Sequence, residues 1–499
     1  MKHLLLKWLA PRLGRHSRAG GNPDRSSNCN QSYALDSRLR GNNGLGAATL
    51  LALLAAFAIA PPAHAEIVDQ TLSNGMRVIV KTDRRAPVAV SQVWYRAGSM
   101  DESYGTTGVA HVLEHMMFKG TKDVPAGEFS RRIAAAGGRE NAFTSHDHTA
   151  YFQTLQKDRL ELALKLEADR MANLTLSADE FAREIQVVME ERRLRTEDNP
   201  QARLHEGLMA TAFQAHPYRH PVIGWMNDLV NMSVDDAREW YRHWYAPNNA
   251  TLVVAGDVDP AQVFAWAKQY FGVLAAHPLP ERKPQREPEQ NGARQVTVKA
   301  PAKLPVVALA WQAPTLADPE KDSDPYALEI LAGVLDGHAS ARLNQSLVRD
   351  QRLATEAGAG YDDISRGPAL FMVDATPAEG HSVAEVEAAL KQEITRIVRD
   401  GVGEQELARV KAQVLASQVY QQDSLFYQAM LIGEWTTAGL DYRARDIRFR
   451  KLKEVTAEQV RAVAAKYLVD DHLTVARLDP QPMEPNKPAR RGLGGRHAN

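Results

Sequence analysis

The stretch "SVDDAREWYRHWYAPNNATLVV" (residues 233–254) returns as "TAEQVRAVAAKYLVDDHLTVAR" (residues 456–477), 223 residues further along the chain. Each copy reads as a capped helix, a short polar turn and a strand rich in β-branched residues. Ser233 and Thr456 occupy the cap position, and Arg238 and Arg461 match inside the helix. A repeat of this length predicts two homologous domains in tandem.

The segments around the repeat set the expected boundaries. We expect a first domain at residues 66–276 and a second at residues 295–482. The stretch between them, "HPLPERKPQREPEQNGAR" (residues 277–294), is rich in proline and charge and has no apolar periodicity, which is typical of a linker. Residues 483–499 have the composition of a disordered tail.

Strand and helix patterns alternate within the first domain. "IVDQTLSNGMRVIVKTD" (residues 67–83) predicts two strands around an Asn74-Gly75 turn, and residues 88–98 predict a third strand. Apolar periodicity predicts helices at about 107–119, 127–136, 158–174 and 178–196. We therefore expect an α+β fold in which each of two tandem homologous domains is a largely antiparallel sheet packed with helices.

The N-terminal region resembles an export signal. Residues 45–60 form an apolar run, and Ala63 and Ala65 then give an A-x-A pattern before Glu66. The alternative is a membrane anchor, but the run is shorter than the ~20 residues that span a bilayer. Residues 1–44 lack apolar periodicity and are a doubtful start. We expect residues 1–65 to be a signal region and the mature chain to be periplasmic.

Composition excludes several classes of protein. The 499 residues are 44% hydrophobic and 24% charged, as in soluble globular proteins, and the formal net charge of −1 gives no support for nucleic-acid binding. Cys29, the one cysteine, lies before the expected cleavage site. The mature chain therefore has neither disulfides nor a cysteine nucleophile.

"GVAHVLEHMMFKGT" (residues 108–121) places ionisable groups in a helix that otherwise reads as buried. At 100° per residue, His115 and Glu114 lie within about 60° of His111, while the apolar residues occupy the opposite face. Thr107 is the expected cap, and Gly120 the expected end. Two imidazoles one turn apart can bind one zinc ion with a carboxylate beside them. The alternative is a solvated face with chance histidines.

A zinc site needs a third protein ligand, and the helix after Ser177 offers candidates. Ser177 and Glu180 form a possible capping box. Glu184 and Glu191 are seven residues apart and share one face with an apolar stripe, where an unpaired carboxylate is costly. An ordinary salt bridge on an arginine-rich helix is the alternative for Glu191.

These residues together resemble the pitrilysin family of inverted-zincin (H-x-x-E-H) metallopeptidases, which includes insulin-degrading enzyme and the mitochondrial processing peptidase. In that family a glutamate ligand follows the motif by some 76 residues, as Glu191 follows His115, and an acidic residue precedes it by seven, as Glu184 does. A Gly-Gly-x-x-Asn-Ala-x-Thr segment lies between, here "GGRENAFT" (residues 137–144). The resemblance covers residues 66–480.

The resemblance implies specific roles. His111, His115 and Glu191 would bind one Zn²⁺ per chain, and Glu114 would be the general base. Glu184 would orient a ligand histidine or assist catalysis. The strand of Asn141, Ala142 and Phe143 would be a sheet edge that pairs with extended peptide substrate. Zinc-activated water would then hydrolyse peptide bonds.

One departure from the family matters. Members that work alone carry an arginine and a tyrosine in a segment such as "LREKRGLAY", which are thought to stabilise the oxyanion. The matching stretch here is "LVRDQRLAT" (residues 347–355), with Val348 and Thr355 in those places and Arg349 out of register. The second half also lacks H-x-x-E-H. We therefore expect a homologous partner subunit to supply the pair in a heterodimer, with a homodimer as an alternative. A non-catalytic scaffold subunit of the same fold is the alternative function.

Overall fold

The computed structural model describes residues 67–483. The expected signal region, with Cys29 and the cleavage site, lies outside the described residues, and so does the expected tail after Met483. Within the described part, no helix is both long and apolar enough to cross a membrane.

Six strands form the first sheet: β1 Ile67–Thr71, β2 Arg77–Thr82, β3 Val88–Tyr95, β4 Arg139–Thr144, β5 Thr149–Gln156 and β6 Ala250–Gly256. Their order is β1-β2-β6-β3-β5-β4, and neighbours run antiparallel except for the parallel pair β2 and β6. Gly75, with φ 87°, makes the predicted turn between β1 and β2. Every residue of β6 is buried, because both faces of the sheet are covered.

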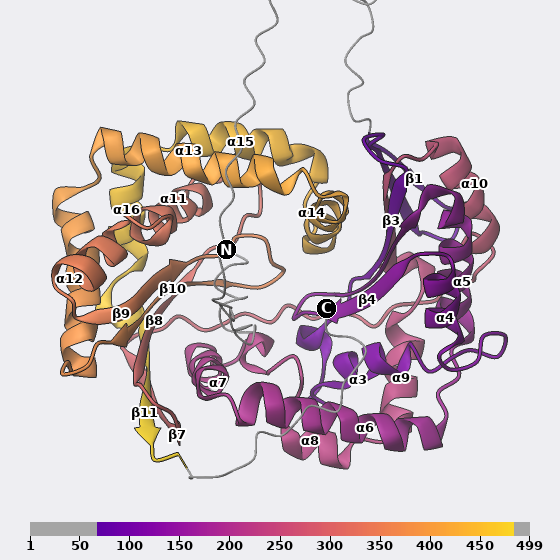
Figure 1. Ribbon diagram of the computed structural model, residues 1–499, viewed down its shortest axis with the longest axis horizontal. Helices are drawn as coiled ribbons and strands as arrows, with labels where there is room; N and C mark the ends of the chain where they lie inside the picture. The colour runs from indigo at the N-terminus through magenta and orange to yellow at the C-terminus, as the bar shows by residue number, and fades with distance from the viewer. Residues whose placement is uncertain (1–66, 484–499) are drawn as a thin grey trace, which may run out of the picture. The chain divides into compact units, whose positions relative to one another are not determined.

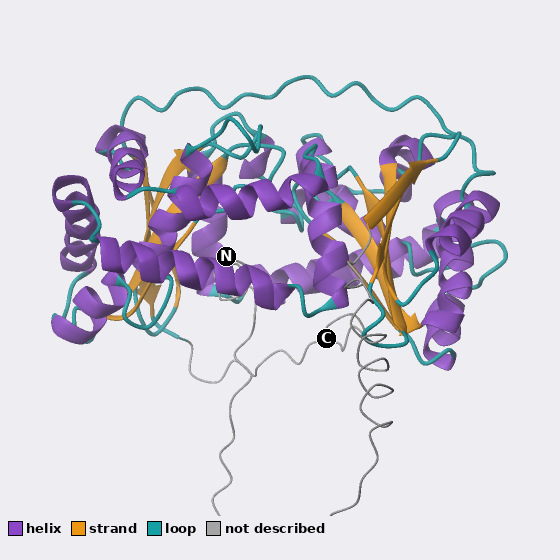
Figure 2. Ribbon diagram, turned by 90° about the horizontal axis from the view of Figure 1, so that it is seen from above, coloured by secondary structure: helices purple, strands orange, loops and turns teal. Residues whose placement is uncertain are grey.

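Five strands form the second sheet: β7 Arg294–Pro301, β8 Val306–Ala313, β9 Ala354–Gly360, β10 Ala369–Pro377 and β11 Leu473–Gln481. Their order is β7-β11-β8-β10-β9, with β7 and β11 parallel. This order repeats that of the first sheet from β2 onward. The expected fold class, two α+β units with largely antiparallel sheets, is confirmed, and Figure 2 shows helices around both sheets.

The helices follow the strands in the same order in both halves. The first half contains α3 Val109–Met116, α4 Glu128–Ala135, α5 Leu160–Asn173, α6 Ala178–Arg192, α7 Pro200–Ala212, α8 Met226–Asn231, α9 Val234–Trp244 and α10 Pro260–Tyr270. The second half contains α11 Asp324–Asp336, α12 Val383–Asp400, α13 Glu404–Gln421, α14 Leu425–Ala438, α15 Arg445–Glu454 and α16 Ala457–Tyr467. The four helices expected in the first half are present: α3, α4 and α5 are shorter at both ends, and α6 begins at the predicted residue 178 but ends at Arg192. A π-helical turn, Arg193–Glu197, follows α6.

The sequence repeat is a structural repeat. Helices α9 and α16 begin and end at positions that differ by 223 residues, as do the first residues of β6 and β11. Both helices start with a reciprocal capping box, Ser233 with Asp236 and Thr456 with Gln459. The same local chemistry therefore fixes the same helix-to-strand connection in both halves.

Each sheet is covered on one face by a helix from the other half. Helix α14 lies against β3 and β6 (Figure 1), where its Ile432 joins one apolar cluster with Val90 and Trp94. A Cβ atom on Gly433 would lie 2.0 Å from the Trp94 indole, so only glycine allows this approach. Helix α7, which corresponds to α14 in the repeat, lies against β7, β8 and β11.

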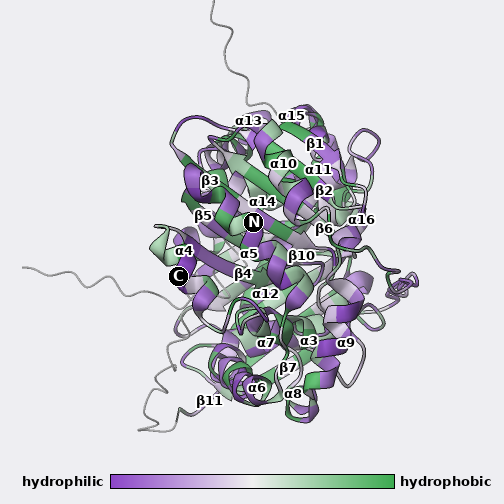
Figure 3. Cartoon of the chain, turned by 90° about the vertical axis from the view of Figure 1, so that its right-hand side faces the viewer, coloured by the Kyte–Doolittle hydropathy of each residue, from purple (hydrophilic) through white to green (hydrophobic). Residues whose placement is uncertain are grey.

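The opposite face of the first sheet carries the helices that matter for the site. Val78, Val80 and Val93 point into a cluster shared with α3, α5, α6 and α9. In Figure 3 the ribbon of the outer helix α9 is mainly in the hydrophilic colour. The aromatic residues of α9, Trp240 and Trp244, are buried core residues, as their apolar pattern indicates.

Candidate metal centre

Helix α3 separates its two kinds of residue as the helical wheel predicts. Val112, Leu113 and Met116 are fully buried in the core, and His111, Glu114 and His115 lie on the opposite side. The predicted cap is wrong: Thr107 bonds to Asp228 and does not cap the helix. The predicted end at Gly120 is also wrong, since α3 ends at Met116.

A buried carboxylate takes the place of the predicted cap. Glu102 accepts hydrogen bonds from the backbone N–H groups of Gly108 (2.8 Å) and Ala110 (2.9 Å), which are otherwise unpaired at a helix start. The N-cap Gly108 has φ 91°, and a Cβ atom there would lie 2.6 Å from a backbone oxygen of Ile223. The start of α3 is therefore fixed by a long-range contact and by glycine geometry.

Helix α6 brings the predicted third ligand to α3. Ser177 caps α6 by accepting the Glu180 N–H, whereas the Glu180 carboxylate pairs with Arg183. Glu184 and Val188 are buried on the face that also carries Glu191. The face predicted from the seven-residue spacing is thus present.

His111, His115 and Glu191 converge. One ligand atom from each lies within 4.8 Å of the others, and among the described residues no other such group of His, Cys, Asp or Glu is found. Glu191 Oε2 lies 3.3 Å from His115 Nε2 and 3.9 Å from His111 Nε2. Tetrahedral zinc with bonds of about 2.0–2.1 Å separates its ligand atoms by about 3.4 Å. The donor set and its spacing therefore fit zinc.

Glu184 determines which nitrogen of His115 faces the metal position. His115 Nδ1 lies 3.0 Å from Glu184 Oε1 and donates to that carboxylate, which leaves Nε2 facing Glu191. Lys119 Nζ lies 2.5 Å from the other oxygen of Glu184. Burial raises the pKa of the Glu184 carboxyl, but the bonds from His115 and Lys119 outweigh it and hold the pKa below its usual value.

Glu191 is also fixed on its outer side. Its Oε1 pairs with Arg195 at 2.5 Å, four residues later in the π-helical turn. Burial raises the Glu191 pKa, but its bond with His115 and the nearby charges bring it to about 2. Burial lowers the pKa of His111 to about 3. Glu191 and His111 thus have the protonation states that bind metal. Burial lowers the pKa of His115, but its bonds with Glu184 and Glu191 outweigh this effect and raise the pKa to about 9, so that His115 must lose a proton when metal binds.

Glu114 lies beside the three converging side chains without joining them. The Thr144 hydroxyl, at the end of β4, donates to Glu114 Oε2. Burial raises the pKa of the Glu114 carboxyl, against the opposing effects of His115 and Thr144. A positioned carboxylate with a raised pKa has the properties of a general base.

The residues predicted to contact substrate lie on β4. This strand is the edge of the first sheet, and among residues 67–483 it pairs only with β5. Asn141 accepts the Ala142 N–H with its side-chain oxygen (2.9 Å), and Phe143 packs edge-on against Trp94. An unpaired strand edge can bind an extended chain through backbone hydrogen bonds.

The second half places no oxyanion donor at the two positions where the family carries one. Val348 packs against the core of that half, and the Thr355 hydroxyl donates to the Thr376 carbonyl (3.3 Å). Arg349 is exposed.

Sequence reasoning named Thr144 within the matched Gly-Gly-x-x-Asn-Ala-x-Thr segment without giving it a role, and it missed Glu102, Lys119 and Arg195, which also hold the site. Lys119 and Arg195 each lie four residues after a predicted ligand, which places them on the same helical face. That spacing could have identified both. Glu102 and Thr144 act on α3 from a preceding loop and from a strand, and no local pattern identifies such contacts.

Comparisons with known proteins agree with this geometry. The profile of the family described as "Insulinase (Peptidase family M16)" matches residues 77–224, and that of "Peptidase M16 inactive domain" matches residues 231–414. A "Zinc protease PqqE" of Helicobacter pylori is 32% identical over 429 residues, which cover 84% of this chain and 93% of that protein. An uncharacterized zinc protease of Mycobacterium leprae is 30% identical over 80% of this chain and 88% of its own.

Solved structures show the same fold. The crystal structure of a protease from Helicobacter pylori has a TM-score of 0.79 and 30% identity and covers 83% of this chain and 100% of that one. The periplasmic protease PqqL from Escherichia coli has a TM-score of 0.72 at 19% identity, and the match covers 84% of this chain but 49% of PqqL. The resemblance to pitrilysin-like peptidases is confirmed, and the chain belongs to the insulinase family of peptidases, peptidase family M16.

Proposed function

We propose that this chain is a zinc-dependent endopeptidase that hydrolyses peptides or unfolded segments. The observation that carries this proposal is the convergence of His111, His115 and Glu191 beside Glu114, which is held by Thr144. Zinc bound there would polarise the scissile carbonyl and lower the pKa of a bound water to about 7.

The chain's own residues would do the rest. The free edge of β4 binds the substrate as an added strand, and Glu184 keeps His115 Nε2 directed at the metal position. Glu114 accepts a proton from the attacking water at its free oxygen and returns it to the leaving amine. Its Thr144 contact keeps this carboxylate in place as its charge changes.

Glu114→Gln tests the proposal. The variant keeps the three ligands and is expected to bind one zinc per chain, while cleavage of an unfolded peptide falls about 10²- to 10⁴-fold because no group accepts the proton. His111→Ala is the matched comparison, since it is expected to lose zinc as well. Cleavage by Glu114→Gln at the unmodified rate would exclude this mechanism.

We infer further that the zinc-bearing chain works with a homologous partner subunit that supplies an arginine and tyrosine for the oxyanion. Val348 and Thr355 support this inference, because neither can stabilise an oxyanion as that pair would. The match to half the length of PqqL is consistent with an assembly of two such units. Loss of an oxyanion donor lowers kcat by about 10²–10³. Full activity of the isolated chain, assayed with and without the co-purifying subunit, would exclude a partner.

A non-catalytic scaffold of the same fold is the second candidate. The family description of residues 231–414 as an inactive domain favours it, as does the missing oxyanion pair. It predicts neither stoichiometric zinc nor any effect of Glu114→Gln on the chain's role, so metal analysis of the purified protein separates the two candidates.

We also propose export to the periplasm. The apolar run at residues 45–60 and the Ala63-x-Ala65 pattern support it. Sequencing the N-terminus of the protein recovered from the periplasm should give Glu66 as the first residue. Recovery of an uncleaved chain from the cytoplasm would exclude export.

A further inference from the structure

Two neighbouring acidic residues, Asp101 and Glu102, precede the zinc-motif helix and face in different directions. Glu102 holds the first turn of α3, as described above. The side chain of Asp101 is buried and is bound by two arginines from distant parts of the chain. Arg282, from the segment between the halves, donates to Asp101 Oδ1 (2.8 Å), and its guanidinium lies 4.2 Å over the Trp244 ring.

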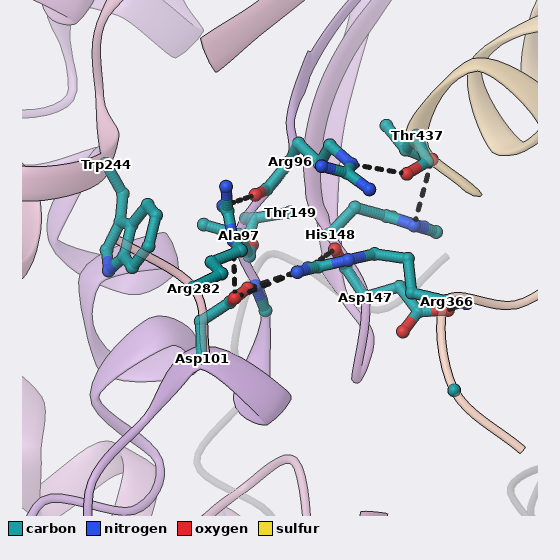
Figure 4. Close-up of polar contacts among 12 residues, drawn as sticks. Arg96, Ala97, Asp101, Asp147, His148, Thr149, Trp244, Arg282, Arg366 and Thr437 are labelled. Carbon is teal, nitrogen blue, oxygen red and sulfur yellow. Dashed lines mark hydrogen bonds and ion pairs between the residues drawn. The ribbon is translucent and has the colours of Figure 1, made fainter. Parts of the chain in front are cut away.

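The second arginine comes from the half without the motif. Arg366, in the loop between β9 and β10, donates to both oxygens of Asp101 at 2.7 and 2.9 Å, as Figure 4 shows. The side chains of Arg366 and Asp101 are only 5% and 4% exposed. A buried, two-pronged arginine–carboxylate pair fixes both position and orientation, because its parallel bonds permit one geometry.

Arg366 also holds the turn that follows β4. Its side chain donates to the Asp147 carbonyl (2.9 Å), and its own N–H donates to the Asp147 carboxylate (3.0 Å). The Tyr218 hydroxyl donates to the same carboxylate and accepts the Gly367 N–H (2.8 Å). The loop carrying Arg366 is therefore attached to the β4–β5 turn at its backbone and at its side chain.

The two segments that Arg366 joins also touch each other. The N–H groups of Ser99 and Met100 donate to the carbonyls of Ser145 and His146, at 3.1 and 2.9 Å. A Cβ atom on Gly98 would lie 2.5 Å from the Ser145 oxygen, so the backbones approach as closely as glycine allows. Arg366 thus bonds to both segments of this contact: the residues just before α3, through Asp101, and the turn after β4, through Asp147.

We propose that Arg366 is a positioning residue for the peptidase site, which holds the metal-binding helix α3 and the substrate strand β4 in register through Asp101 and Asp147. The half without a metal ligand thereby contributes to the site of the other half. The proposal rests on the peptidase function proposed above. It explains why a buried ion pair is present here, since a pair of this kind adds little stability by itself.

Conservative substitution tests this role. Arg366→Lys keeps the charge but cannot bond both Asp101 oxygens and the Asp147 carbonyl together. Arg342→Lys is the matched control, because Arg342 makes an equivalent two-pronged pair with Glu406 and a bond to the Gly401 carbonyl entirely within the second half. Both variants are compared with the unmodified chain, purified with its co-purifying subunit.

The first readout needs neither metal nor activity. In the zinc-free protein, hydrogen–deuterium exchange of the amides in residues 99–110 and 139–148 is expected to increase together, about tenfold, in Arg366→Lys because the local opening of both segments becomes easier. The Arg342→Lys control is expected to leave both segments unchanged. Unchanged exchange in Arg366→Lys, or an increase in one segment alone, would overturn the proposal.

The second readout is peptide cleavage. Arg366→Lys is expected to lower kcat/KM about 10- to 100-fold while the chain still binds one zinc, because a misplaced substrate strand lies out of reach of Glu114. The Arg342→Lys control is expected to cleave normally. Normal cleavage by Arg366→Lys, with an active unmodified enzyme, would also overturn the proposal. If the unmodified enzyme has no activity, the peptidase function is contradicted instead. The exchange measurement would then still show whether Arg366 holds α3 and β4 together.

A double substitution tests whether Arg366 acts through its pair with Asp101. If Arg366 acts through Asp101, the exchange increase in Asp101→Asn with Arg366→Lys should be smaller than the product of the two single effects. Multiplicative effects would overturn the route through Asp101.

Discussion

Corresponding helices of the two halves, α3 and α11, have surroundings of different polarity. In the first half, α3 faces α6 across His111, His115 and Glu191. In the second half, α11 takes the place of α3 and packs against α13 through Gly333, whose added Cβ would lie 2.8 Å from a Val410 methyl group. Ionisable side chains thus lie between α3 and α6, whereas α11 and α13 are in direct apolar contact.

The difference shows that the fold does not require the polar site. The second half forms the same sheet order, although between its two ends α11 carries only one charged residue. This residue, Glu329, pairs with Arg448. The sheet order and helix arrangement of this fold therefore do not depend on the ionisable groups of α3 and α6. Substitutions that exchange features between the halves can test this conclusion.

The largest expected effect is on metal binding. Glu184→Gln removes the carboxylate that orients His115, and the zinc affinity is expected to fall about 10- to 100-fold, as for other residues that hold a metal-bound histidine. Competition with a chromogenic chelator measures the change. Glu190→Gln on the same helix is the control, since Glu190 pairs with Arg193. Equal affinities of all three proteins would remove Glu184 from the site.

Filling the close approach in the second half should destabilise it. Gly333→Leu overpacks the contact with Val410, and the free energy of unfolding is expected to fall by about 2 kcal/mol, as measured in denaturant. The double variant with Val410→Ala makes room for the leucine and should recover most of the loss. An unchanged Gly333→Leu midpoint would show that α11 and α13 are not tightly packed.

A buried charge distinguishes the two sheets. Lys81 on β2 is buried, whereas Val298 takes the matching place on β7. Burial, with the nearby Arg445, lowers the Lys81 pKa to about 8. The unfolded chain therefore binds more protons between about pH 8 and 10.5, and stability should rise with pH over this window and stay flat below it.

Lys81→Met should remove that pH dependence. It should also raise the free energy of unfolding at pH 7 by about 1–2 kcal/mol, less than the pKa change implies because Asp83 loses a neighbouring positive charge. Denaturant titrations at pH 7 and 10 give both quantities. A variant that is less stable at pH 7 would show that the charge is well accommodated.

The smallest expected effect concerns the residue that leads into the edge strand of each sheet. Gly137 (φ 72°) precedes β4 by two residues, and Arg352 (φ 54°) precedes β9 by two. Arginine pays a steric penalty in this left-handed conformation, so Arg352→Gly should stabilise the chain by about 0.5–1 kcal/mol after the entropy of glycine is included. The reverse change, Gly137→Arg, should destabilise it. Thermal midpoints that move the other way would contradict this reading of the backbone.

Several features were predictable because they depend on local periodicity. The repeat around Ser233 and Thr456, the two faces of α3, and the shared face of Glu184 and Glu191 all follow from residues that are close in sequence. That α3 and α6 lie side by side was expected from the 76-residue spacing between His115 and Glu191, which matches the family. Their roles as ligands and supports remain predictions that metal analysis will test.

Other features depend on contacts between distant segments and had no local signal. The cap of α3 is Glu102 and not Thr107, because Thr107 is engaged by Asp228 from α8. The link from Arg366 to Asp101 crosses 265 residues. Nothing in the local sequence of α7 and α14 indicates that each packs on the sheet of the other half.

The position of α14 has a consequence for synthesis. Trp94 leaves the ribosome long before Gly433, which packs against its indole and lies 339 residues later. At translation rates of about 5–20 residues per second, roughly 20–70 s pass between the synthesis of β3 and that of α14, the helix that covers one face of the first sheet. During that interval a nascent chain presents an apolar sheet surface to its surroundings.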